Sequence, residues 1–182
     1  MEKRYNIGYY TGTFDMFHTG HLAGLKRASE MCEKLIVGVS TDEVVYDYKH
    51  KMPVIPFEDR IKIVDSLGCV FRAIPQFDLH NKLDVCKAIG ADVLFSSAEY
   101  LKESYDDLSK LSQKELDGLE RWEEFSKEAN ENGIDVVFFE RVDGISSTQI
   151  KETILANSGY QKPNDQMIYS EGEVNDEDYM CQ

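Results

Sequence analysis

Positive charge is scarce in this chain of 182 residues, in which 20 lysines and arginines stand against 34 aspartates and glutamates. A domain that binds nucleic acid non-specifically needs a basic face, so the net charge of −14 argues against a nucleic-acid partner. The acid is concentrated in residues 103–131, with ten acids and four bases, and in residues 163–182, with six acids and no base. Each segment carries −6, which leaves −2 for the rest of the chain, so a local anion site is compatible with the charge.

Long apolar runs and paired cysteines are also missing. No run approaches the roughly 18–20 residues that span a bilayer, and residues 1–6 lack the apolar stretch of a signal peptide. No CxxC pair occurs, so the sequence indicates neither a zinc knuckle nor a disulfide framework; the four cysteines are Cys32, Cys69, Cys86 and Cys181. We therefore expect a cytoplasmic protein with reduced thiols and no membrane partner.

Short apolar runs alternate with segments of helical period, which is typical of parallel βαβ units. The predicted strands are Asn6–Tyr10, Leu35–Ser40, Val70–Ile74, Asp92–Phe95 and Val136–Glu140. The predicted helices are Gly20–Glu33, Phe57–Leu67, Asn81–Ile89, Gln113–Asn130 and Thr148–Ala156. The sequence thus predicts an α/β fold, a Rossmann-like doubly wound sheet of five parallel strands, with ligands bound at the carboxyl ends of the strands.

The length fits a single domain. We expect this α/β domain to span residues 1–158, with an acidic helical insert at about residues 101–132 that serves as a lid or an interface. The polar, acidic residues 159–182 are expected to form a flexible C-terminal tail.

The most informative segment runs from Thr11 to His21, where the first strand leads into a helix. It contains two histidines three residues apart, His18 and His21, beside the N–H groups and positive dipole of a helix start, where imidazoles can donate to an anion. The alternative is a satisfied loop histidine and a helix-capping histidine. A metal site is less favoured, because His50 and His80 fall in unrelated loops.

The pattern GTFDxxHxGH, formed by residues 12–21, resembles the signature of HIGH-type nucleotidyltransferases, and most of all that of glycerol-3-phosphate cytidylyltransferases. Other segments resemble this family in the same order along roughly 125 residues between Tyr5 and Ala156. They are Ser40-Thr41-Asp42-Glu43, the basic loop with Lys49 and Lys51, the segment with Arg60, and Arg141-Val142-Asp143-Gly144-Ile145-Ser146-Ser147-Thr148.

The resemblance implies transfer of CMP from CTP to a phosphorylated alcohol, with Mg²⁺ accompanying the triphosphate and a homodimer as the assembly. Because the acceptor's phosphate is already a nucleophile, the protein mainly positions substrates and neutralises charge. The resemblance also implies catalytic roles for His18, His21, Lys49 and Arg141. The expected nucleotide-binding residues are Gly12, Thr13, Phe14, Gly20, Lys51, Arg141, Ile145, Ser146, Ser147 and Thr148, and the expected acceptor-binding residues are Asp42, Lys49 and Arg60.

Several of these residues have structural alternatives. Ser146–Thr148 are also good N-capping residues, and Lys49 and Lys51 also suit a solvated loop. Arg60 could instead pair at the surface with Glu58 or Asp59.

Two aspartates likewise leave alternatives open. Asp42 either accepts from a hydroxyl of the acceptor or caps the short helix after the second strand. Asp15 either orients its own loop through Asx-type hydrogen bonds or holds Mg²⁺ through water.

The sequence departs from the family after the fourth predicted strand, where Ser96-Ser97-Ala98-Glu99-Tyr100 replaces a Gly-Asp-Asp element followed by Trp. Val142 also stands where the family has Thr. The phosphate-handling residues remain, so a change of substrate is favoured over a change of reaction. An adenylyltransferase of the same superfamily, or a nucleotide-binding regulatory protein without turnover, are the alternatives.

Overall fold

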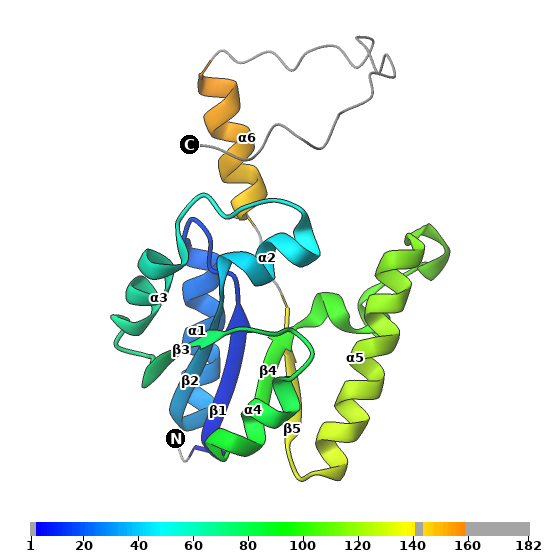
Figure 1. Cartoon of the computed structure of the whole chain (residues 1–182). Coiled ribbons are helices and arrows are strands. Elements are labelled where there is room, and N and C mark those ends of the chain that lie inside the picture. The colour runs from blue at the N-terminus through cyan, green and yellow to red at the C-terminus, as the bar shows by residue number, and fades with distance from the viewer. Residues whose placement is uncertain (1–2, 141–143, 159–182) are drawn as a thin grey trace, which may run out of the picture.

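The computed structural model describes residues 3–140 and 144–158 of the chain. Its five strands form one parallel sheet in the order β3-β2-β1-β4-β5, as the sequence predicts (Figure 1). They are β1 (Tyr5–Gly12), β2 (Cys32–Ser40), β3 (Arg72–Gln76), β4 (Val93–Ser97) and β5 (Asp135–Phe139). The strand order reverses between β1 and β4, and this switch point is where open α/β sheets bind their ligands.

Within the described residues, six α-helices connect or follow the strands: α1 (Thr19–Met31), α2 (Asp42–Lys49), α3 (Phe57–Asp65), α4 (Lys82–Ile89), α5 (Gln113–Glu131) and α6 (Ser147–Asn157). The first helix ends two residues before the predicted Glu33, because Cys32 is already extended and pairs with Tyr5 of β1. Three short 3₁₀ turns, within Ala98–Lys110, lead from β4 to α5.

Each face of the sheet carries its own apolar core, which explains the doubly wound arrangement. On one face, Leu25 and Ala28 of α1 and Val64 of α3 pack in a cluster with Val37 and Phe95 of the sheet. On the other face, Tyr9 and Leu94 meet Leu83 and Cys86 of α4 and Ala129 of α5. These residues are at most 7% exposed, so burial of both faces fixes the sheet and the loops that extend from it.

The predicted acidic insert, expected to serve as a lid or an interface, contains α5. Its helix α5 is the crossover between β4 and β5, with Leu119 and Ala129 buried and Trp122 and Phe125 packed against the second core. The charged residues lie on its outer side, as in Glu120 and Glu124. The helix thus forms part of the layer that covers the sheet.

In contrast, α6 stands beyond the carboxyl edge of the sheet (Figure 1). None of its residues is buried, and Ile154 is 58% exposed. No helix among the described residues is both long and apolar enough to cross a membrane.

Candidate functional site at the carboxyl edge of the sheet

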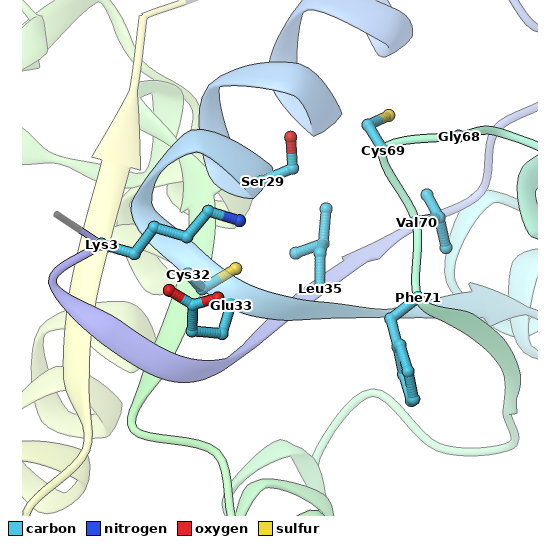
Figure 2. A pocket seen from close by; sticks show the side chains of 9 residues that line it. All are labelled: Lys3, Ser29, Cys32, Glu33, Leu35, Gly68, Cys69, Val70 and Phe71. Carbon is cyan, nitrogen blue, oxygen red and sulfur yellow. The ribbon is translucent and has the colours of Figure 1, made fainter. Parts of the chain in front are cut away.

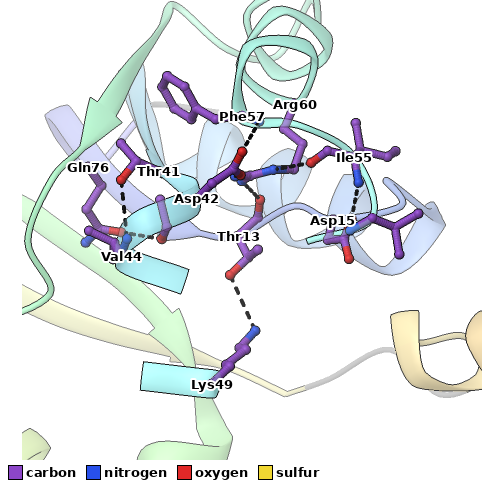
Figure 3. Close-up of polar contacts among 12 residues, drawn as sticks. Thr13, Asp15, Thr41, Asp42, Val44, Lys49, Ile55, Phe57, Arg60 and Gln76 are labelled. Carbon is purple, nitrogen blue, oxygen red and sulfur yellow. Dashed lines mark hydrogen bonds and ion pairs between the residues drawn. The ribbon is translucent and has the colours of Figure 1, made fainter. Parts of the chain in front are cut away.

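The loop after β1 is held by Asp15, whose carboxylate reaches a distant part of the chain. Its Oδ1 accepts from the N–H groups of Val54 and Ile55, each at 3.0 Å, and its Oδ2 lies 3.2 Å from Lys151 Nζ. Figure 3 shows this carboxylate beside Ile55. These bonds differ from the predicted local Asx-type contacts, and they join the loop to the segment before α3 and to α6.

Asp15 is only 6% exposed, and burial by itself raises the pKa of a carboxyl group. The N–H groups of Ile55 and Val54 and the ammonium of Lys151 outweigh this effect, so the pKa of Asp15 lies below its usual value. The carboxylate is therefore ionised at neutral pH. Both of its oxygens already face donors, which does not suit a magnesium ligand.

The two histidines meet at the start of α1. The Nδ1 atom of His18 accepts from the N–H group of Gly20 at 3.1 Å, so His18 is the N-cap of the helix, and the His21 ring stacks on it with centroids 3.9 Å apart. Because Nδ1 is an acceptor, the proton of neutral His18 must lie on Nε2. The capping role and a donor role thus use different atoms of the same ring.

Phe14, Gly12 and Gly20 contribute to this arrangement of the two histidines. Phe14, which is predicted to bind the nucleotide, is 3% exposed, and its ring lies edge-on to His21, so its side chain supports the histidine. A Cβ at Gly12 would lie 2.9 Å from the Phe14 ring, and a Cβ at Gly20 would lie 3.0 Å from the His18 ring. Each glycine therefore makes room for a site side chain.

The start of α6, which comes from the other end of the chain, contacts the histidine loop. Ser146 caps α6 by accepting from Gln149 N–H at 3.1 Å, and Ser147 Oγ donates to the carbonyl of Asp15 at 2.9 Å. A Cβ at Gly20 would lie 3.5 Å from the carbonyl oxygen of Ile145. The structure thus brings the histidine loop and the serine-rich helix start together. Thr148 is exposed in the first turn of α6, and Arg141 lies outside the described residues.

A hydroxyl cluster joins the site loop to α2. Thr13 Oγ1 lies 3.0 Å from the hydroxyl of Tyr48 and accepts from Lys49 Nζ at 3.4 Å. Lys49 is the last residue of α2 rather than part of a loop, while Lys51 is exposed just beyond it. The sequence analysis did not include Tyr48, since a tyrosine beside two lysines carries no distinctive signal.

Arg60 and Asp42 form an internal ion pair, in place of the predicted surface pair of Arg60. The arginine is fully buried, and its guanidinium lies 2.6 Å from Asp42 Oδ1 while donating to the carbonyls of Ile55 and Thr13 (Figure 3). It does not pair at the surface with Glu58 or Asp59, and its donors serve the chain itself.

Asp42 does not cap the helix after the second strand, which was one of its two sequence interpretations. Thr41 caps α2, whereas Asp42 Oδ2 accepts from the N–H group of Phe57, the first residue of α3. Both oxygens of the predicted acceptor ligand therefore bind groups of α3.

The ends of β1, β2 and β3 are linked through Ser40 and through Gln76, a residue that was not predicted from the sequence. Ser40 Oγ donates to Gln76 Oε1 at 2.8 Å and lies 3.4 Å from the carbonyl of Gly12. Thr41 N–H donates to the carbonyl of Gln76 at 3.2 Å. This chain of contacts runs along the carboxyl edge and fixes the loop that leads from β3 to α4.

A separate pocket of about 290 Å³ lies at the opposite, amino edge of the sheet. Figure 2 shows its lining of Lys3, Ser29, Cys32, Glu33, Leu35, Gly68, Cys69, Val70 and Phe71. None of the predicted site residues lines it, so it is distinct from the histidine loop.

A family model described as "Cytidylyltransferase-like" matches residues 9–153, which include the histidine loop and the start of α6. The chain belongs to this cytidylyltransferase-like family. It is 32% identical over 145 residues to the glycerol-3-phosphate cytidylyltransferase of Bacillus spizizenii, covering 80% of this chain and 94% of that one. The corresponding enzyme of Staphylococcus aureus is 29% identical over 79% of this chain and 90% of its own length.

Another relative is the bifunctional protein HldE of Caulobacter vibrioides, which is 35% identical over 54% of this chain. The chain spans about a fifth of the length of that protein. Among solved structures, the lipopolysaccharide core biosynthesis protein of Thermoplasma volcanium superposes with a TM-score of 0.54 at 21% identity. That match covers 78% of this chain and 99% of the other chain, and at this identity it shows the shared fold.

Within this family the site places two imidazoles and the ammonium of Lys49 around a single loop. The Ser147 hydroxyl fixes the start of α6 to the same loop, since it donates its proton to the carbonyl of Asp15. Donors fixed in this way can stabilise charge that develops on phosphate oxygens.

Proposed function

We propose that this protein is a cytidylyltransferase that transfers CMP from CTP to a phosphorylated alcohol of the glycerol 3-phosphate type, releasing pyrophosphate. The observation that carries the proposal is the meeting of the His18–His21 stack with the start of α6 around Gly20. The names of the relatives that span most of both chains support CTP and glycerol 3-phosphate as the substrates.

In the proposed reaction, an oxygen of the acceptor's phosphate forms a bond to the α-phosphorus of CTP. The bond from that phosphorus to the oxygen bridging toward the β-phosphate breaks, and pyrophosphate leaves with its electron pair. Negative charge grows on the non-bridging oxygens and on the leaving group, so preorganised donors lower the barrier. No general base is needed, because the attacking phosphate is already ionised at neutral pH.

The residues of the chain take separate parts in this step. His18 donates through Nε2, since its Nδ1 is occupied by Gly20 N–H, and the stacked His21 ring holds it in place. The positive end of α6 and the hydroxyls at its start suit the outer phosphates of the triphosphate. Lys49, which Thr13 holds near the loop, is exposed and supplies a charge for the leaving group.

Magnesium would enter with the triphosphate and would neutralise part of its charge. Asp15 is unsuited to hold it, because Val54, Ile55 and Lys151 already face its carboxylate oxygens.

The test is pyrophosphate release with each of four nucleoside triphosphates and glycerol 3-phosphate, with Ser29→Ala beside the pocket at the opposite, amino edge of the sheet as the control. Release that requires both CTP and the acceptor, and that persists in the control, supports the proposal. Release with ATP instead would identify an adenylyltransferase. Tight CTP binding without release for any phosphorylated alcohol would identify a nucleotide-binding protein without turnover.

A further inference from the structure

The helix α6 begins at the site, yet it offers no buried face to the domain. None of its residues is buried, and it lies beyond the carboxyl edge of the sheet (Figure 1). Two of its side chains bind one residue of the histidine loop: Ser147 Oγ donates to the carbonyl of Asp15 at 2.9 Å, and Lys151 Nζ lies 3.2 Å from Asp15 Oδ2. Because Ser147 and Lys151 are four residues apart, they lie on the same side of the helix. Polar contacts with Asp15 thus hold this side of α6 on the loop.

Asp15 itself lies in a strained part of the histidine loop. Its two neighbours, Phe14 and Met16, have φ angles of 54° and 47°, in the left-handed region that residues with bulky side chains rarely adopt. Such a conformation persists only where the surrounding contacts hold it. The Asp15 carboxylate provides these contacts, because Oδ1 accepts from two N–H groups of the segment before α3 while Oδ2 faces Lys151. The same loop leads to His18, the N-cap of α1, so contacts at Asp15 affect the position of the histidine stack.

The ion pair between Lys151 and Asp15 is placed to orient α6 more than to stabilise the fold. The side chain of Lys151 is 45% exposed, and solvent screens an ion pair that is open on one side, so the pair adds little to the free energy of unfolding. The two N–H groups at Oδ1 keep the Asp15 carboxylate in place without the lysine. Removal of the ammonium should therefore shift α6 on the loop and leave the domain folded.

We infer that Lys151 is a positioning residue, which holds the start of α6 against the histidine loop through Asp15. The inference rests on the proposed function, because it concerns the spacing between the histidine stack and the start of α6, both of which that function assigns to the triphosphate. A displacement of about 1 Å between groups that act on one reacting centre is enough to lower its rate. Lys151 acts through Asp15 and is not itself a ligand of the phosphates.

Lys151→Met removes the ammonium and keeps a long side chain. We expect kcat for pyrophosphate release from CTP and glycerol 3-phosphate to fall about tenfold, while KM for glycerol 3-phosphate and the unfolding temperature stay unchanged. Lys151→Arg keeps the charge and should restore most of the rate. Lys62→Met is the matched control and should leave kcat unchanged, since Lys62 also pairs with an aspartate, Asp59 at 3.6 Å, on the exposed side of α3. Equal kcat in Lys151→Met and the wild type overturns the inference.

A double-mutant cycle separates positioning from direct binding of the phosphates. Asp15→Asn removes the charge that faces Lys151, and circular dichroism checks that the variant is folded. If the lysine acts through Asp15, Lys151→Met should have little further effect on kcat in the Asp15→Asn background. An undiminished loss of rate in that background would assign Lys151 to the phosphates and overturn the inference.

The ring signals of His18 and His21 in NMR spectra provide a readout that does not need turnover. The chain has four histidines, so alanine variants assign these two rings. Their chemical shifts should change in Lys151→Met and stay as in the wild type in Lys62→Met. Unchanged ring signals in Lys151→Met overturn the inference whether or not the wild type is active. Shifted ring signals in a protein whose wild type releases no pyrophosphate with any phosphorylated alcohol would support the positioning and overturn the proposed function alone.

Discussion

The rings of His18 and His21 lie face to face, with centroids 3.9 Å apart and planes inclined by 22°. Replacing either histidine by alanine removes one donor and frees the ring that remains. We expect turnover to fall by about 10²–10³-fold, the scale seen when one preorganised donor to a transition state is lost. The rate of pyrophosphate release from CTP in the presence of glycerol 3-phosphate measures this effect.

His18→Asn separates catalysis from helix capping. Asparagine is a good N-cap, so its side-chain oxygen can replace Nδ1 as the acceptor for Gly20 N–H. We expect the thermal stability of this variant to exceed that of His18→Ala while its turnover stays equally low. Turnover equal to that of the wild type would show that His18 serves only as a cap.

Asp15→Asn should reveal a pH-dependent contribution to stability. The folded pKa of Asp15 lies below its usual value of 3.8, so the ionised carboxylate stabilises the fold above that pH, and this contribution disappears as the pH falls through the folded pKa. At pH 7 we expect the free energy of unfolding of the variant to be about 1.5–3 kcal/mol lower than that of the wild type, because the substitution removes hydrogen bonds to a charged group. The difference should shrink steadily below about pH 4.

Urea unfolding at several pH values tests this expectation. Asp59→Asn is the matched control, since within the described residues Asp59 forms an ion pair only with the exposed Lys62 at 3.6 Å, and it should change stability by less than about 0.5 kcal/mol. A difference between wild type and Asp15→Asn that stays constant from pH 7 to pH 3 would contradict the role of the ionised carboxylate.

The sequence predicts the sheet and the convergence of its loops better than it predicts the partners of each charged side chain. Short apolar runs, separated by segments of helical period, locate the five strands to within a few residues. A strand that is buried on both faces of the sheet requires such an apolar run. The histidine loop and the start of α6 are also anticipated, since parallel strands bring their carboxyl ends to one edge.

The predictions for charged residues are wrong where the partners of these residues are distant in the sequence. Arg60 follows two acids and has the local pattern of a surface helix, yet it is buried by contacts with Asp42 and Thr13, which lie 18 and 47 residues away. Asp15 has the pattern of an Asx turn, but its carboxylate binds N–H groups 39 and 40 residues away. No local periodicity encodes such pairs, because they depend on how loops from different strands pack together.

Arg60→Met tests whether this arginine supports the fold or binds the acceptor. Removing one partner of a buried ion pair typically costs about 3–5 kcal/mol, so urea unfolding should show a large loss of stability. Asp42→Asn should lose less, because Asp42 is partly exposed and its amide still accepts from Phe57 N–H. Normal stability of Arg60→Met together with a raised KM for glycerol 3-phosphate would instead assign the arginine to the acceptor.

Gly20→Ala should impair activity without loosening the fold. Alanine is favoured over glycine in a helix by up to about 1 kcal/mol, but the added methyl carbon would lie 3.0 Å from the His18 ring and 3.5 Å from the Ile145 carbonyl. The ring is the part that can shift, so we expect turnover to fall about tenfold or more while the unfolding temperature stays within a few degrees of the wild type.

Gly118→Ala provides the comparison for this helix substitution. Gly118 lies in α5, and among the described atoms a Cβ there would meet the end of the Arg121 side chain at 3.9 Å. It should raise the unfolding temperature slightly and leave pyrophosphate release unchanged. If Gly20→Ala retained full turnover, the position of the His18 ring against the start of α6 would not limit the reaction, and the convergence of these two elements would lose its catalytic meaning.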